Sequence, residues 1–172
     1  MAAGATYVSI ASETLSSAAA SVTFSSISGV YTDLVLIGSV IGSTNDQGLR
    51  VTVNGDTSSG FYSSTTILGG SSAVASNRTS NANLIYLLGY TYGVNTTYGV
   101  PFIFSFMNYS NTTTNKTILG RSLAIRNDGG GETYAKVGLW RNTSAITSMV
   151  FTLDSGNIAS GSTFSLYGIA AA

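Results

Sequence analysis

Residues 49–56 read Leu-Arg-Val-Thr-Val-Asn-Gly-Asp and contain the two signals that decide the fold. The apolar residues Leu49, Val51 and Val53 alternate with polar ones, so their side chains share one face of an extended chain. The pair Asn54-Gly55 follows directly, and both residue types tolerate a positive φ. We therefore expect a half-buried β-strand that ends in a tight turn.

Similar signals recur along the whole chain. Alternation, or a short apolar run bounded by turn residues, predicts further strands at residues 6–11, 21–27, 31–40, 61–68, 83–88, 100–109, 116–126, 133–140, 145–153 and 162–169. The run 31–40 is almost continuously apolar, which is typical of a central strand covered on both sides. Residues 127–131, Asn-Asp-Gly-Gly-Gly, predict a flexible hairpin tip. Only residues 12–20 fit a helix, and that helix would be short and rich in serine.

About ten strands separated by turns, with almost no helical periodicity, indicate an all-β fold. Many antiparallel strands in one unit favour a two-sheet sandwich, with a jelly-roll arrangement as the first expectation. We find no internal repeat and no linker. Residues 1–172 are therefore expected to form a single β-sandwich domain.

Charge is unusually sparse. Seven basic and seven acidic residues give a net charge of zero, and the charged fraction is 8%, against about 25% in typical soluble domains. Ser, Thr, Gly and Asn supply the polarity instead. A neutral surface does little to repel other copies of itself, which favours a role inside an ordered assembly. The basic residues are scattered, so nucleic acid is not an expected partner.

The expected compartment follows from what the sequence lacks. There is no cysteine, which favours folding in a reducing cytoplasm. The first residues show no basic region followed by an apolar run, so no signal peptide is expected. No apolar stretch is long enough for a membrane helix, and a membrane is not an expected partner.

The residue inventory argues against catalysis. The chain has no histidine and no cysteine, which removes the commonest general base and nucleophile pairs. A pair of carboxylates could still serve a glycosidase, but nearly all the carboxylates fall at predicted turns or strand ends, where Asp ordinarily caps the chain. We expect no enzyme activity and no cofactor. A calcium site is weighed at the loop aspartates Asp46, Asp56, Asp128 and Asp154, and isolated turn aspartates are the preferred interpretation.

A tyrosine-rich stretch is the candidate contact surface. Tyr90, Tyr92, Asn95 and Tyr98 lie in a segment that also holds several glycines. Core packing can account for part of this set. Exposed Tyr and Asn are also the residues that adaptable recognition and subunit contacts use.

Both ends of the chain resemble a known family. The motifs are Tyr7-Val8-Ser9-Ile10-Ala11-Ser12-Glu13-Thr14-Leu15, residues 20–27 and 31–36, residues 49–56 with Tyr62-Ser63, and Trp140 with residues 145–147 and 161–169. They resemble a family of small virion proteins of tailed bacteriophages, well represented in marine and cyanobacterial phages. The middle, roughly residues 69–116, is not covered. The resemblance implies a β-sandwich present in many copies per particle, with no catalysis.

These observations lead to a ranked expectation about function. The first is a capsid decoration or cement protein on the outer head surface of the virion, assembled in the host cytoplasm, with the major capsid protein and copies of itself (a homotrimer or a lattice) as partners. The alternative is a tail-fibre or tail-tip module that binds a host surface glycan or protein, since Tyr, Asn and Ser loops suit sugars. A carboxylate-dependent glycan hydrolase is a weaker third.

Overall fold

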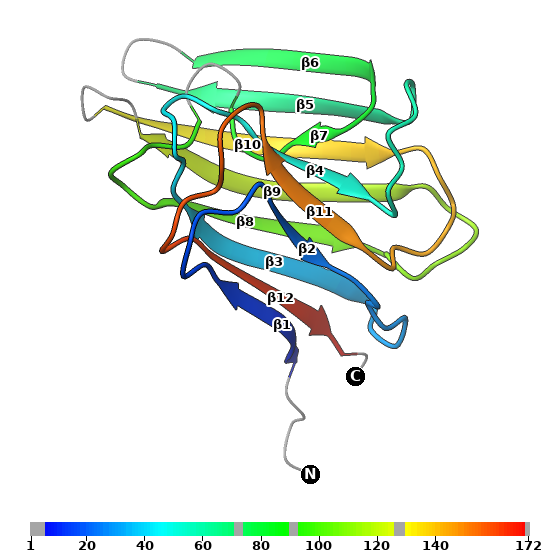
Figure 1. Ribbon diagram of the computed structural model, residues 1–172. Helices are drawn as coiled ribbons and strands as arrows, with labels where there is room; N and C mark the ends of the chain where they lie inside the picture. Colours follow the sequence, from blue (N-terminus) through cyan, green and yellow to red (C-terminus); the bar gives the residue numbers. More distant parts are fainter. Residues whose placement is uncertain (1–5, 71–73, 90–92, 126–129, 171–172) are drawn as a thin grey trace.

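Two antiparallel sheets of unequal width face each other in the computed structural model, which describes residues 6–70, 74–89, 93–125 and 130–170 (Figure 1). The large sheet has eight strands, in the spatial order β1 (Tyr7–Thr14), β12 (Thr163–Ile169), β3 (Asp33–Val40), β8 (Val100–Met107), β9 (Lys116–Ile125), β10 (Gly131–Trp140), β5 (Tyr62–Gly69) and β6 (Val74–Ala82). The small sheet has four, in the order β2 (Ser21–Phe24), β11 (Met149–Leu153), β4 (Leu49–Val53) and β7 (Ile85–Tyr86).

The strand order is that of a jelly roll with two added hairpins. Without β5, β6, β9 and β10, the sheets read β1-β12-β3-β8 and β2-β11-β4-β7. The chain crosses between the sheets from β1 through β4, stays in the small sheet for β7, and then crosses again for β8, β11 and β12. This is the eight-stranded double Greek-key pattern. The hairpins β5–β6 and β9–β10 only widen the large sheet, and the predicted fold class is confirmed.

The core lies where the small sheet covers the large one. Leu36 and Phe104 of the large sheet and Val51 of the small one are fully buried, as the alternation in their strands requires. Across the two sheets, the rings of Phe151 and Phe164 have centroids 5.5 Å apart. Removal of these apolar side chains from water is the main force that holds the layers together.

A cluster of hydrogen-bonded and stacked side chains surrounds the turn that follows β4. Asn54 and Gly55 have φ values of 52° and 67°, and Asp56 N–H donates to the Val53 carbonyl at 2.9 Å, so the predicted turn is confirmed. The Asp56 carboxylate then accepts a 2.8 Å hydrogen bond from Trp140 Nε1. Burial by itself raises the Asp56 pKa, but the hydrogen bonds to the carboxylate, including the one from Trp140, together lower it more. The Asp56 pKa is therefore below its ordinary value. Trp140 is 1% exposed, and its ring stacks on Tyr62.

Three local expectations need correction. The helix expected at residues 12–20 is wrong, because β1 extends to Thr14 and no helix occurs in the described residues. Strand β6 was not expected, and it raises the number of described strands to twelve. The run 31–40 does form an inner strand, β3, but Ile37 is 41% exposed, so its second face is only partly covered. The pairing of β9 with β10 is confirmed, and the tip at 127–131 lies largely outside the described residues.

Candidate functional site

The inner face of the large sheet becomes polar where the small sheet ends. Here the inner face means the face that the small sheet covers over the core. Lys136 of β10 is in register with Thr66 of β5, which is in register with Asn77 of β6. These three side chains form one row across the strands. Because paired residues in adjacent strands point to the same face, the inner face here consists of hydroxyl, amide and ammonium groups.

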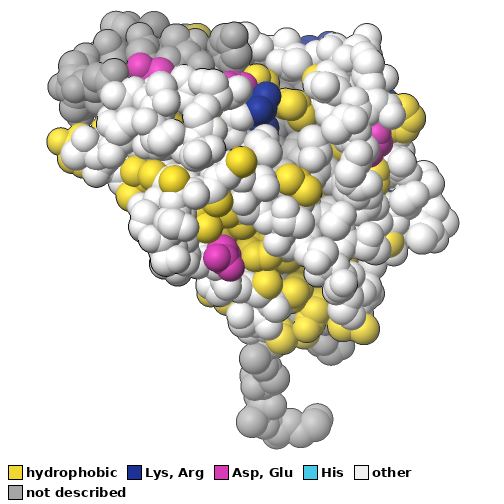
Figure 2. Space-filling model, viewed as in Figure 1, with side chains coloured by type: hydrophobic (Ala, Val, Ile, Leu, Met, Phe, Trp, Pro, Cys, Tyr) yellow, Lys and Arg dark blue, Asp and Glu magenta, His cyan; other side chains and the backbone are white. Residues whose placement is uncertain are grey.

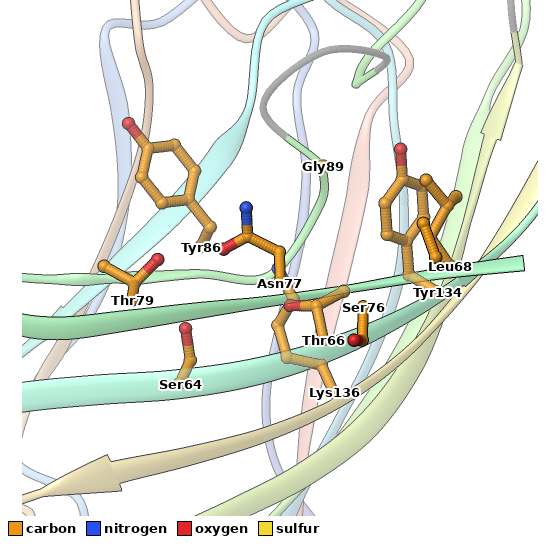
Figure 3. Close-up of a pocket in the computed structure, with 11 residues that line it drawn as sticks. Ser64, Thr66, Leu68, Ser76, Asn77, Thr79, Tyr86, Gly89, Tyr134 and Lys136 are labelled. Atoms are coloured by element: carbon orange, nitrogen blue, oxygen red, sulfur yellow. The ribbon is translucent and has the colours of Figure 1, made fainter.

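A pocket of about 510 Å³ lies over this polar row. Its wall on the sheet side comes from β5, β6 and β10, and its opposite wall from Tyr86 and Gly89 (Figure 3). The lining residues are Ser64, Thr66, Leu68, Ala75, Ser76, Asn77, Thr79, Tyr86, Gly89, Tyr134 and Lys136. In Figure 3 the Asn77 amide points into the space between Tyr86 and Gly89. The volume falls in the range of small-ligand sites, about 300–1,000 Å³.

Lys136 is the unusual residue of the pocket. It is only 5% exposed, and within the described residues it forms no ion pair with a carboxylate. Desolvation lowers the Lys136 pKa from 10.5 to about 8, because burial disfavours the charged form. At pH 7 the ammonium form of Lys136 therefore predominates, and no described carboxylate pairs with it.

A second buried lysine shows the ordinary solution to the same problem. Lys116, at the start of β9, is fully buried, and its Nζ donates to the carbonyls of Thr114 at 2.7 Å and Thr143 at 2.9 Å. Desolvation lowers the Lys116 pKa as well. Lys116 is thus satisfied by backbone acceptors, whereas Lys136 opens into a pocket.

The two aromatic walls of the pocket are held by hydrogen bonds. Tyr134 Oη donates to the Glu132 carboxylate at 2.9 Å, and Tyr86 Oη donates to Asp154 at 2.8 Å. Asp154 also accepts from Gly48 N–H at 2.9 Å and lies 3.5 Å from the Arg50 guanidinium. Such ties limit ring rotation, so the pocket is largely formed before a ligand arrives.

The opposite, outer face of the large sheet carries an exposed apolar surface. The outer patch comprises Ile37, Ile67, Ile103, Leu119 and Val137, whose side chains are 41% to 56% exposed. Ile37 pairs with Ile103, and Leu119 pairs with Val137. Arg121 lies between the two halves of the patch, opposite Ile103 and Ala135. A shallow apolar depression of about 390 Å³ opens here beside Ile37 and Ile103.

Charged side chains are also few on the side of the small sheet. Figure 2, viewed from that side, shows scattered acidic and basic groups on a surface that is mostly uncharged. The composition already implied this, since charged residues make up 8% of the chain. No grouping of three or more His, Cys, Asp and Glu in the described ranges could hold a metal ion. No helix in those ranges is long and apolar enough to span a membrane.

The predicted contact surface is only partly placed. Tyr90 and Tyr92 lie outside the described residues. Tyr98 is 52% exposed, but Asn95 is 3% exposed, and its Oδ1 accepts from the N–H groups of Thr97 and Tyr98 at 2.7 and 3.1 Å. Asn95 therefore shapes the turn that presents Tyr98. As a contact surface, the set of four stays a prediction.

Sequence reasoning missed the pocket. The sequence feature that corresponds to the pocket is Lys136, which lies in the middle of a predicted strand on the same face as Tyr134 and Trp140. Comparison with known proteins adds no candidate, since no family model, curated protein or solved structure matches this chain. The resemblance to phage virion proteins likewise stays a prediction.

Proposed function

We propose that this protein is a non-enzymatic structural component of a bacteriophage particle, and specifically a decoration protein on the outer surface of the capsid. The observation that carries the proposal is the outer patch. It is a broad sheet face with exposed Ile, Leu and Val, crossed by few charges. Exposed apolar surfaces of this kind mark protein contacts more often than free surface.

The physical role follows from repetition. Each copy would bury the outer patch against the major capsid protein or a neighbouring copy, gaining about 25 cal/mol for every Å² of apolar surface removed from water. On a lattice, a modest contact per copy is sufficient, because simultaneous contacts raise the effective concentration of each one. A zero net charge adds no repulsion between copies. The shell would thereby resist the outward pressure of packaged DNA.

Jelly rolls build both viral capsid domains and lectins, and a fold alone does not imply a function. A tail-fibre or tail-tip module that binds a host glycan is therefore the second candidate. Its supporting observation is the hydroxyl- and amide-lined pocket on the inner face.

The position of the protein in purified virions tests the proposal. Quantitative mass spectrometry should find a copy number close to that of the major capsid protein, and an antibody against this chain should label heads. A copy number as low as that of tail components, with label on tails, would favour the second candidate. Absence from the particle would refute both.

A matched pair of variants tests the outer patch itself. Leu119→Lys places a charge in the patch, and purified protein should then lose most of its binding to heads that lack it, measured by co-sedimentation. Thr23→Lys adds the same charge to an exposed position of β2, on the small sheet, and should bind as the wild type does. Equal binding by both variants would contradict the use of this face.

A further inference from the structure

We propose that the pocket between β10, β5, β6 and Tyr86 binds an acidic sugar, with the carboxylate of the sugar on Lys136 Nζ. This site lies on the opposite face of the sheet from the outer patch and is independent of the capsid role. The proposal rests on two separate observations: a largely buried lysine that forms no ion pair with any described residue, and a neutral hydrogen-bonding wall around it.

An anion would stabilise the ammonium group of Lys136. A charge removed from water is costly unless it is paired, and Lys136 is 5% exposed and forms no ion pair within the described residues. Within the same sheet, Lys116 shows that this chain can satisfy a buried lysine with carbonyl groups. At Lys136 the space that an acceptor would occupy belongs to the pocket. An incoming carboxylate would supply the missing partner.

The rest of the lining selects a polyhydroxylated ligand over a bare ion. Thr66 and Asn77 share the row of Lys136, and Ser64 and Thr79 form the neighbouring row. Hydroxyl and amide groups both donate and accept hydrogen bonds, as sugar hydroxyls do. The pocket is about 510 Å³, far larger than one inorganic anion needs.

The aromatic side chains of the pocket also fit a sugar ring. Tyr86 and Tyr134 line the pocket with rings whose hydroxyls are tied to Asp154 and Glu132, and aromatic faces contact the C–H side of sugars. A pyranose ring that carries hydroxyl groups and one carboxylate matches this combination of walls.

The pKa of Lys136 should also change when an acidic sugar binds. The pKa of Lys136 is about 8 in the free protein, so the ammonium form predominates at pH 7 and is largely lost by pH 10. The titratable groups near it are Tyr86 and Tyr134 in the lining, with Asp154 and Glu132 bonded to their hydroxyls. A bound carboxylate should raise the Lys136 pKa, because it favours the charged form.

The test uses the full chain and a matched pair of probes, trigalacturonate and its methyl ester, in calorimetric titrations at pH 7. The wild type should bind the acidic trimer at least about tenfold more tightly than the ester, a difference of about 1.4 kcal/mol. Lys136→Met should abolish that preference. Arg121→Met removes the same charge from the outer face of the adjacent strand and should keep it.

Further measurements keep the proposal falsifiable. Asn77→Ala, in the exposed strand β6, should weaken acidic trimer binding about tenfold and serves if Lys136→Met is poorly folded. The ¹³Cε resonance of Lys136 should titrate at a higher pH with the trimer bound. Inorganic phosphate that binds as tightly as the trimer would show an anion site without sugar recognition. Equal affinity for acid and ester, or no binding of either at millimolar concentration, would overturn the proposal, whatever the outcome at the outer patch.

Discussion

The inner face of the large sheet has two halves with opposite chemistry. Beneath the small sheet, Leu36 and Phe104 are fully buried among apolar neighbours. Beyond it, Lys136, Thr66 and Asn77 occupy the equivalent face. The change takes place in one step, because Gly120 of β9, which Phe104 covers, pairs directly with Lys136 of β10. What lies opposite a strand, rather than the strand itself, determines the side chains that its inner face can carry.

The largest expected effect is a difference in the loss of stability when a side chain is truncated in the covered half or in the polar half. Phe104→Ala should lower the free energy of unfolding by about 3–5 kcal/mol, because it leaves a cavity in the covered core. Thr66→Ala, on the same face but in the polar half, should cost under about 1 kcal/mol. Urea unfolding of both variants provides the measurement. Similar losses for the two would show that the polar half is also a stabilising core.

The second effect is a gain in stability when the lysine of the polar half is replaced. Lys136→Met should raise the free energy of unfolding at pH 7 by an amount on the order of 3 kcal/mol, since the pKa falls from 10.5 to about 8 on folding and each unit corresponds to about 1.36 kcal/mol. The comparable change at Lys116 should destabilise, because it leaves the carbonyls of Thr114 and Thr143 without their donor.

The pH dependence checks the cause of that gain. Between the folded pKa of about 8 and the unfolded value of 10.5, the unfolded chain binds more protons at Lys136, so wild-type stability from this group rises with pH. The gap between Lys136→Met and the wild type should therefore be full at pH 7 and shrink toward pH 10.5. A gap that stays constant across this window would point to packing rather than charge.

The smallest effects come from glycines in the two halves. A Cβ at Gly120 would lie 2.2 Å from a ring carbon of Phe104 and 2.3 Å from the Ile103 carbonyl oxygen, so Gly120→Ala should cost about 1–3 kcal/mol. At Gly69, the end of β5, a Cβ would meet nothing within 4 Å. Gly69→Ala should therefore be neutral or stabilise by about 0.4–1 kcal/mol. Thermal unfolding of both variants distinguishes tight from open packing.

The covered half could be predicted from sequence, and the polar half could not. In β8 of the large sheet, Phe102, Phe104 and Phe106 alternate with less buried residues, because one face of the strand meets the core. Strand β6 lacks such a signal, since the side chains on both of its faces are exposed along most of its length, and from Ser76 to Asn81 all of them are polar. Strand pairing alone, through its backbone hydrogen bonds, holds β6 to β5.

The pocket was not predicted because the usual placement of polar and apolar side chains is reversed in part of β10. In β10 the general rule would direct Val137 inward and Lys136 outward, yet Val137 is 52% exposed and Lys136 is buried. The reversal arises because Trp140 and Tyr134, on the face of Lys136, pack inward, and the two-residue period then fixes Lys136 on the same side. An unexpected buried lysine and an exposed apolar patch are thus two results of one register.

The β5–β6 and β9–β10 hairpins leave the jelly roll and return to it without changing the order of its other eight strands. Thr133 of β10 pairs with Gly69 of β5, so the far ends of both hairpins lie at one end of the sheet. Residues added between β5 and β6, or between β9 and β10, would therefore leave the pairing of those eight strands unchanged.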